Sequence, residues 1–192
     1  MQAFLMDLIL NPLIAEAIVR KVAAHTRALA LASAGAGIDV LCFYDDAGTQ
    51  RGLQLSPELW RRFIKPRWRE ILSELRSAYP DCRFFLHSCG NIEAILADIV
   101  ELGFHILHPI QPECMDLERV KRDFGARILL SASLSAQRLL PFGSAEEIRR
   151  EVRRLRRLFA GDGRCILCPA NRLQPETPWA NILAFAEEAR RL

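Results

Sequence analysis

Two side chains that could bind a metal ion lie two positions apart in the stretch CRFFLHSCGN, residues 82–91. The apolar run Phe84–Leu86 that precedes them is typical of a buried strand. Because side chains alternate between the faces of a strand, His87 and Cys89 would project to the same side. Nitrogen and sulfur are donors that zinc prefers. The spacing therefore predicts a zinc site at His87 and Cys89; the alternative is a histidine packed at a strand end beside a buried cysteine.

A catalytic zinc site needs a third protein ligand and an open position. Among the six cysteines, Cys168 is the best placed, because it lies at the carboxyl end of another apolar run, residues 164–169. Cys42 lies in the middle of a strand-like run and is expected in the core. Cys82 precedes its strand and is expected to be inert. The residues that could replace Cys168 as the third ligand are Glu113, Cys114, Asp45 and Asp46.

Charged and amide side chains follow the same apolar runs. Asp45 and Asp46 come directly after a strand, where a charge is costly unless something binds there. Since successive residues point in opposite directions, one aspartate would face the site and the other would anchor a loop. Gln50, Gln111 and Asn171 are neutral polar residues suited to hydrogen-bonding a substrate, although each alone could be structural. We predict that the aspartates are catalytic and that the three amides bind substrate.

The elements that would position these residues alternate strictly between helix and strand. The predicted strands are residues 38–44, 83–87, 104–110, 126–134 and 164–169. The predicted helices are residues 12–34, 56–75, 91–102, 116–125, 144–159 and 177–192. This order predicts an α/β protein with a parallel sheet and crossover helices, either an open doubly wound sheet or part of a (β/α)8 barrel. In both architectures the functional residues lie at the carboxyl ends of the strands.

Local signals predict several helix boundaries and one irregularity. Asp116 and the stretch SAEE, residues 144–147, are typical helix N-caps. Thr177 is expected to cap the last helix, with Pro178 as its first residue. Pro66 is expected to bend the helix over residues 56–75, because proline removes a backbone donor.

Composition limits the classes of protein that this chain can represent. It has 192 residues, is 51% hydrophobic and carries a net charge of only +3, as expected of a globular protein with a substantial core. The arginine-rich segment 149–159 lacks interleaved aromatic residues and is interpreted as a solvated helix face, so no nucleic-acid partner is expected. We detect no signal peptide, membrane span or disulfide framework, and expect a cytoplasmic protein with reduced thiols and no membrane partner.

Several motifs, in this order and spacing, resemble the uroporphyrinogen decarboxylase superfamily over nearly the whole chain. They are NP (11–12), GIDVLCFYDDAGTQ (37–50), LSPELWRRFIKP (55–66), FFLHSCGN (84–91), ILHPIQPECMDLERVKRDFG (106–125), RLLPFGSAEEIRREV (138–152) and QPETPWANILAF (174–185). The resemblance implies a (β/α)8 TIM barrel. The superfamily includes the decarboxylase of haem biosynthesis and zinc-dependent methyltransferases that move a methyl group between a corrinoid and a thiol.

The resemblance favours the methyltransferase branch, because those enzymes carry an HxC pair that His87 and Cys89 match. It implies zinc, a corrinoid as methyl donor, a small-molecule or corrinoid substrate, and a corrinoid protein as partner. The third methyltransferase ligand, a cysteine, falls near Asn171 rather than at Cys168, which is a departure from the pattern. The alternative is decarboxylation of a tetrapyrrole carboxylate, with one of the aspartates at 45–46 stabilising a protonated intermediate.

The length is a second departure from the resembling family. Five predicted strands cannot close a barrel, and such barrels typically need about 250 residues. We therefore expect residues 1–192 to form one domain of this type, a partial barrel that lacks the amino-terminal strands. A partial barrel would leave strand edges open, which predicts self-association or pairing with a separately encoded first half. A third alternative is an inactive, truncated half barrel.

Overall fold

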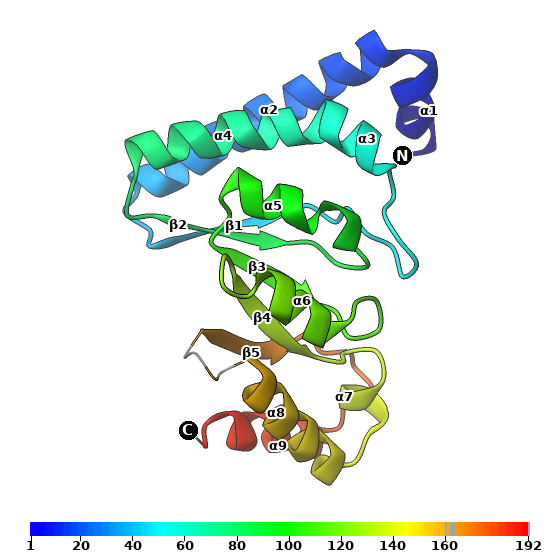
Figure 1. Cartoon of the computed structure of the whole chain (residues 1–192), viewed down its shortest axis with the longest axis vertical. Coiled ribbons are helices and arrows are strands. Elements are labelled where there is room, and N and C mark those ends of the chain that lie inside the picture. The colour runs from blue at the N-terminus through cyan, green and yellow to red at the C-terminus, as the bar shows by residue number, and fades with distance from the viewer. Residues whose placement is uncertain (160, 162–163, 192) are drawn as a thin grey trace.

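A single parallel sheet of five strands organises the protein (Figure 1). The computed structural model describes residues 1–159, 161 and 164–191. The strands are β1 (Val40–Tyr44), β2 (Arg83–His87), β3 (Ile106–Ile110), β4 (Leu129–Leu134) and β5 (Cys165–Pro169). Their order in the sheet equals their order in the chain, and every neighbouring pair is parallel. Each crossover therefore moves in the same direction, which confirms a partial barrel and excludes a doubly wound sheet.

Helices cover one face of this sheet, as Figure 1 shows for the series α4, α5, α6 and α8. Neighbouring members of the series contact one another, and α9 packs on α8. The helices of the amino-terminal half are α1 (Gln2–Leu10), α2 (Pro12–Gly35), α3 (Pro57–Leu59), the π-helical turn η1 (Trp60–Ile64) and α4 (Lys65–Ala78). The remaining helices are the 3₁₀ turn η2 (Glu93–Ile95), α5 (Leu96–Leu102), α6 (Leu117–Phe124), α7 (Leu139–Phe142), α8 (Ala145–Phe159) and α9 (Trp179–Ala189).

The predicted helix starts are confirmed at two places and wrong at one. The carboxylate of Asp116 accepts hydrogen bonds from the first turn of α6. Ser144 and Glu147 exchange the reciprocal bonds of a capping box at the start of α8. Thr177 does not cap α9: Pro178 is the N-cap, and the buried Thr177 hydroxyl has no hydrogen-bond partner among the described residues. The sequence interpretation missed α1 and α7 and extended the last helix to residue 192, which lies outside the described residues.

The helix expected over residues 56–75 is interrupted just before Pro66. The backbone N–H of Lys65 bonds to the carbonyl of Trp60, five residues back, which defines the π-helical turn. Such turns add one residue to a helical repeat and shift the face that the following residues present. Trp60 and Phe63 within the turn and Trp68 beyond it are all buried, so the shift keeps large aromatic side chains on the face that packs against the rest of the protein.

Side chains alternate between the two faces of the sheet: one set forms the core under the helices, and the other set faces away from the helices. Leu41, Phe43 and Leu86 are buried under the helices. Val40, Cys42 and Tyr44 alternate with the buried residues of β1 and are exposed. The prediction that Cys42 lies in the core is therefore wrong. Its face would line the interior of a complete barrel, and no described residues cover it in this sheet.

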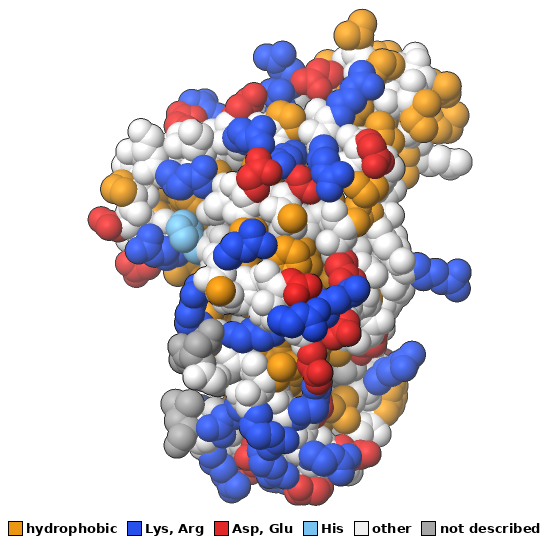
Figure 2. All heavy atoms as spheres, viewed as in Figure 1, with side chains coloured by type: hydrophobic (Ala, Val, Ile, Leu, Met, Phe, Trp, Pro, Cys, Tyr) orange, Lys and Arg blue, Asp and Glu red, His pale blue; other side chains and the backbone are white. Residues whose placement is uncertain are grey.

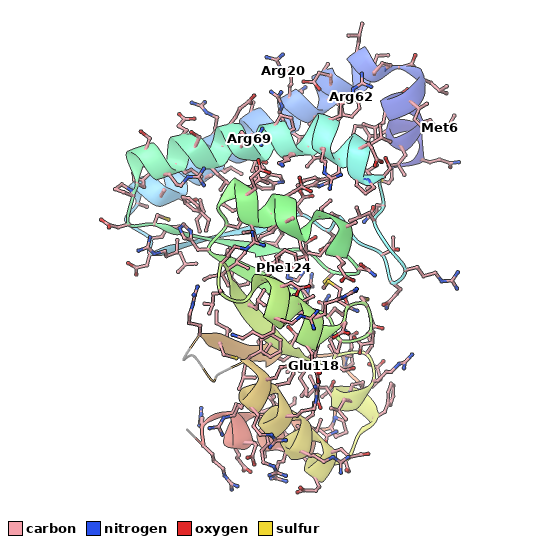
Figure 3. The ribbon with its side chains drawn as sticks, in the orientation of Figure 1. Met6, Arg20, Arg62, Arg69, Glu118 and Phe124 are labelled. Carbon is pink, nitrogen blue, oxygen red and sulfur yellow. The ribbon has the colours of Figure 1, made fainter. Side chains whose placement is uncertain are left out.

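A buried ion cluster joins α4 and its preceding turn to α5. Lys65 bonds to Asp98 at 2.7 Å, and both side chains are almost inaccessible. Burial alone would raise the pKa of Asp98, but hydrogen bonds from Arg61 and Lys65 outweigh burial and lower it. Arg69, labelled on α4 in Figure 3, bonds to the exposed Glu101 of α5 at 2.7 Å. These contacts fix α5 over the sheet, close to the end of β2.

Apolar side chains gather on the surface over α1 and the start of α2, in the upper right of Figure 2. Met6, Leu10 and Leu13 are 52%, 66% and 86% exposed. This end of the molecule is therefore its most apolar visible surface. Among the described helices, none has the length and apolarity needed to cross a membrane.

Candidate metal centre

The carboxyl end of β2 holds two potential ligands side by side. His87 is the last residue of β2, and its Nε2 lies 3.2 Å from the Sγ of Cys89. Tyr44 of β1 and His108 of β3 are the register partners of His87. Their ring centroids lie 5.0 Å and 4.9 Å from that of His87. The imidazole of His87 is therefore held between two rings with one nitrogen directed at the sulfur.

Asp46 completes a group of three possible ligands. Its Oδ1 lies 3.6 Å from the Nε2 of His87. The same oxygen accepts a hydrogen bond of 2.8 Å from the backbone N–H of Cys89. The ligand atoms of Asp46, His87 and Cys89 all lie within 4.8 Å of one another, and the described residues contain no other such group of histidine, cysteine and acidic side chains. The loops after β1 and β2 thus bring one oxygen, one nitrogen and one sulfur together.

Two glycines allow these loops to touch. Gly90 has a φ of 84°, and a Cβ there would lie 2.6 Å from the carbonyl oxygen of Thr49. A Cβ on Gly48 would lie 2.5 Å from the carbonyl oxygen of Cys89. The contact is closed by the backbone N–H of Asn91, which donates to the Thr49 carbonyl at 2.7 Å. Because no side chain fits between the two loops, their glycines set the distance between Asp46 and Cys89.

Asn171 reaches the same sulfur from the loop after β5. Its Nδ2 lies 3.2 Å from the Sγ of Cys89, and its Oδ1 accepts a bond of 2.7 Å from the backbone N–H of Arg172. The Oδ1 bond fixes which end of the amide faces the thiol. Asn171, close to where the resemblance places the third methyltransferase ligand, thus donates a hydrogen bond to the sulfur of Cys89.

The other predicted amides lie beside the group and support its loops. Gln111 is buried and accepts a bond of 3.0 Å from the backbone N–H of Gly90. Gln50 donates to the Oε1 of Gln137 at 2.7 Å and accepts from the Cys114 thiol at 2.8 Å. A cavity of about 170 Å³ opens between these residues, and every side chain that lines it is neutral. The residues around it are Gly48, Thr49, Gln50, Cys89, Gly90, Gln111, Ala136, Gln137, Ala170 and Asn171.

Three other candidate residues lie apart from the ligand group. Asp45 points the other way from Asp46, and its Oδ2 accepts a bond of 2.8 Å from the indole N–H of Trp68. Cys168 lies on β5 with its Sγ 2.8 Å from the Ser131 hydroxyl, and it does not join the group. Glu113 accepts a hydrogen bond from Ser135 instead. The structure therefore brings Asp46, and none of these three, to the histidine and cysteine.

Burial controls the protonation of the group. It raises the pKa of the Cys89 thiol to about 11, and the neighbouring carboxylate of Asp46 adds to the increase. Burial lowers the pKa of His87, partly offset by Asp46. It also raises the pKa of Asp45, against the hydrogen bond from Trp68. At neutral pH the pair therefore consists of a neutral imidazole and a thiol that keeps its proton unless a cation replaces it.

The donor set fits a zinc ion. Zinc takes histidine nitrogen, cysteine sulfur and carboxylate oxygen, and catalytic sites use three such ligands. Asp46 is 56% exposed, so the group is accessible from solvent. The sequence interpretation preferred Cys168 as the third ligand and kept Asp46 among the alternatives, whereas the group in the structure includes Asp46. The strand signal identified both aspartates but could not decide between them, because that choice depends on the contact between the two loops.

The fold and the site together define a class of protein. A parallel sheet wound in one direction, with its polar residues at the carboxyl ends of the strands, is the arrangement of (β/α)-barrel enzymes. A sequence model of the family described as uroporphyrinogen decarboxylase (URO-D) matches residues 1–192. The chain belongs to the uroporphyrinogen decarboxylase family.

Two curated relatives and one solved structure are methyltransferases by name. The methylcobamide:CoM methyltransferase MtaA of Methanosarcina barkeri is 28% identical over 158 residues, which are 82% of this chain and 43% of that protein. The protein of the same name from M. barkeri strain Fusaro is 27% identical over the same shares. A methyltransferase from Methanosarcina mazei matches the fold with a TM-score of 0.77 and 26% identity, over 98% of this chain and 52% of that one. The chain spans about half the length of these relatives or less.

Proposed function

We propose that Asp46, His87 and Cys89 bind zinc and that the site serves the transfer of a methyl group from a methylcobamide to a thiol. The observation that carries this proposal is the group of three donors within 4.8 Å at the carboxyl end of the sheet. The relatives support the choice of reaction, because the name of MtaA states a methylcobamide as donor and CoM as acceptor. The chain departs from the methyltransferase pattern in using Asp46 as the third ligand, in place of the cysteine that the resemblance places near Asn171.

The bound ion would supply one kind of chemistry: it stabilises a substrate thiolate at its open position. The protein's own residues do the rest. His87 at the end of β2, Cys89 in the loop that follows it and Asp46 in the loop after β1 would hold the ion. Asn171 donates a hydrogen bond to the Cys89 sulfur, which withdraws charge from that sulfur and favours attack by the substrate's sulfur instead. The neutral cavity beside Cys89 receives the rest of the acceptor.

The reaction balances without an external oxidant or reductant. The acceptor's S–H proton leaves to solvent, which reaches the site past the exposed Asp46. The sulfur then attacks the methyl carbon, a carbon–sulfur bond forms and the carbon–cobalt bond breaks. Its electron pair stays on the cobalt of the corrinoid. The protein contributes position and electrostatic stabilisation of the thiolate rather than a covalent intermediate.

Metal analysis tests the proposal on the chain as it stands, because all three ligands lie within it. Protein purified without chelators should contain about one zinc per chain, as expected of a three-ligand site. Cys89→Ser and His87→Asn should each lose most of the metal. Cys168→Ser is the matched control and should keep it, because Cys168 lies outside the group. Folded protein that neither carries zinc nor binds added zinc would rule the proposal out.

Methyl transfer from methylcobamide to a small thiol is the second measurement. The curated relatives are more than twice as long as the segment they share with this chain. The assay is therefore run with the chain alone and with an amino-terminal half barrel from a methyltransferase relative added. Activity that needs both this half barrel and Cys89 supports the proposal. Zinc binding with no transfer in either mixture restricts the chain to metal binding and refutes the methyl-transfer part.

Decarboxylation of a tetrapyrrole carboxylate is the second candidate, and one observation favours it. Asp45 lines a cavity of about 460 Å³ together with Arg67, and an arginine is suited to holding a carboxylate. The two candidates use different aspartates. Asp45→Asn should abolish a decarboxylase but leave zinc binding intact, whereas Asp46→Asn should weaken zinc binding.

A further inference from the structure

A chain of two hydrogen bonds runs from β5 to the candidate ligand His87. The Nε2 of His108 on β3 lies 3.2 Å from the carbonyl oxygen of Pro169 at the end of β5. The Nδ1 of His108 lies 2.7 Å from the Nδ1 of His87 on β2. The first bond passes over β4, which lies between β3 and β5 in the sheet. Nothing in the proposed methyl transfer uses His108 directly.

The proton positions along this chain follow from the chemistry of its ends. A carbonyl oxygen can only accept, so the Nε2 of His108 must carry the proton in the bond to Pro169. In a neutral imidazole the other nitrogen, Nδ1, then has a free lone pair. It can only accept from the Nδ1 of His87, which must therefore carry a proton. The remaining nitrogen of His87, Nε2, is left with its lone pair directed at Cys89 and Asp46.

We infer that His108 is a positioning residue that holds His87 in the tautomer competent to bind a metal ion. The inference rests on the proposed zinc site and deepens it. Metal-bound histidines generally donate their other N–H to an acceptor that fixes tautomer and ring orientation. Here the acceptor is a second histidine, which is fixed in turn by a backbone carbonyl on another strand. The ligand on β2 is thereby oriented by β5, the strand whose following loop also brings Asn171 to Cys89.

The packing around both rings supports a positioning role. His108 stacks on Phe85 with a centroid separation of 5.6 Å and an interplanar angle of 28°. His87 lies between Tyr44 and His108. The two imidazoles are register partners on adjacent strands, so the backbone sets their spacing. Neither ring needs to move for the short bond between them to persist when a metal ion enters.

Nitrogen-15 NMR of the histidine rings in the metal-free protein tests the tautomer without any activity. The chain has four histidines, and His105 serves as an internal reference because its Nδ1 accepts from the backbone N–H of Phe84. His105 and His108 should carry their protons on Nε2, and His87 should carry its proton on Nδ1. A His87 ring protonated on Nε2 would overturn the inference whether or not the protein binds zinc.

Two substitutions at His108 then separate positioning from packing. His108→Asn places an oxygen close to the former Nδ1 and can still accept from His87, whereas His108→Phe keeps a ring but removes the acceptor. In competition with a zinc chelator, the phenylalanine variant should bind zinc about 10- to 100-fold more weakly, the loss typical of such a partner. The asparagine variant should bind it about tenfold more tightly than the phenylalanine variant.

The outcomes distinguish this inference from the proposed function. Equal affinities for the phenylalanine variant and the wild type, or equal losses in both variants, refute the positioning role of His108 while leaving the zinc site standing. A wild type that binds no zinc refutes the proposed function, and the NMR measurement still decides the tautomer. If the phenylalanine variant fails to fold, the asparagine variant and the wild-type spectrum carry the test.

Discussion

Alanine substitutions at three glycines should separate two effects on stability. One is the conformational cost of a positive φ, and the other is the steric cost of a Cβ between the loops of the metal centre. Gly37 and Gly90 both have a positive φ, 83° and 84°. A Cβ on Gly37 meets nothing within 4 Å, whereas on Gly90 it would lie 2.6 Å from the Thr49 carbonyl oxygen. Gly48 lacks the positive φ, but its Cβ would lie 2.5 Å from the Cys89 carbonyl oxygen. Gly37→Ala thus carries only a conformational cost, Gly48→Ala only a steric cost, and Gly90→Ala both.

The size of each effect follows from these geometries. The left-handed conformation costs an L-residue about 1–2 kcal/mol, and overpacking costs about 1–3 kcal/mol. The lower entropy of the unfolded alanine chain offsets about 0.4–1 kcal/mol in all three variants equally. We therefore expect the free energy of unfolding to fall by about 1 kcal/mol for Gly37→Ala and about 3 kcal/mol for Gly90→Ala. For a chain of this size the latter corresponds to a Tm lower by about 6–12 °C.

Urea unfolding followed by circular dichroism, with zinc removed, measures these differences. Zinc affinity is then measured on the folded variants. Gly48→Ala and Gly90→Ala should weaken zinc binding, because they push apart the loops that carry Asp46 and Cys89, and Gly37→Ala should not. The reasoning is refuted if Gly90→Ala is no more destabilising than Gly37→Ala, or if Gly37→Ala weakens zinc binding as much as the other two.

Substitutions at four further residues test other parts of the structure. Asp98→Asn should lower the free energy of unfolding by about 3 kcal/mol, because it removes the buried charge beside Lys65 and leaves that ammonium with only the exposed Glu101 as its carboxylate partner. Glu101→Gln should cost less than about 1 kcal/mol, because Glu101 is exposed. Equal losses in chemical denaturation would contradict the buried pair. The pKa of Asp98 is lower in the folded state than in the unfolded chain. Its stabilising effect is therefore complete above the unfolded-state pKa of about 3.9 and is lost as the pH falls through the lower folded-state pKa. The free energy of unfolding should consequently change less with acid pH in Asp98→Asn than in the wild type. Asp116→Ala should cost about 1 kcal/mol through the lost cap of α6, and an unchanged melting temperature would contradict that role. Asn171→Cys should raise the zinc affinity measured in chelator competition, because the Asn171 side chain already lies 3.2 Å from the sulfur of Cys89. Asn171→Ser is the control. Equal zinc affinities of the two variants would show that a thiol at residue 171 does not reach the ion.

The sequence was sufficient to predict the strands and the shared direction of His87 and Cys89. Both follow from short-range periodicity: β2 ends at His87 as expected, and side-chain alternation alone places the pair on one side. The direction of the crossovers was not predictable, because an open doubly wound sheet and a barrel have the same alternation of helices and strands. The observed strand order decides between them.

The third ligand was not predictable for a different reason. Asp46 joins the pair because the loops after β1 and β2 touch through Gly48 and Gly90, a contact between segments far apart in the sequence. Cys168 sits within β5, three strands away from β2 in the sheet order. Asn171, beyond the end of β5, reaches back to Cys89 across the open end of the sheet. The position of each residue along its strand correctly predicted that these residues lie at the carboxyl ends of the strands. The distances between them across that end of the sheet depend on the curvature of the sheet.

X-ray absorption at the zinc edge tests the central claim most directly, because it counts the sulfur atoms bound to the ion. If Asp46, His87 and Cys89 are the protein ligands, zinc-loaded protein should show one sulfur at about 2.3 Å and nitrogen or oxygen at about 2.0–2.2 Å for the rest. The sulfur should be absent in any zinc-loaded Cys89→Ser variant and unchanged in Cys168→Ser. A shell of two sulfurs in the wild type that falls to one in Cys168→Ser would contradict the account, as would a shell with no sulfur.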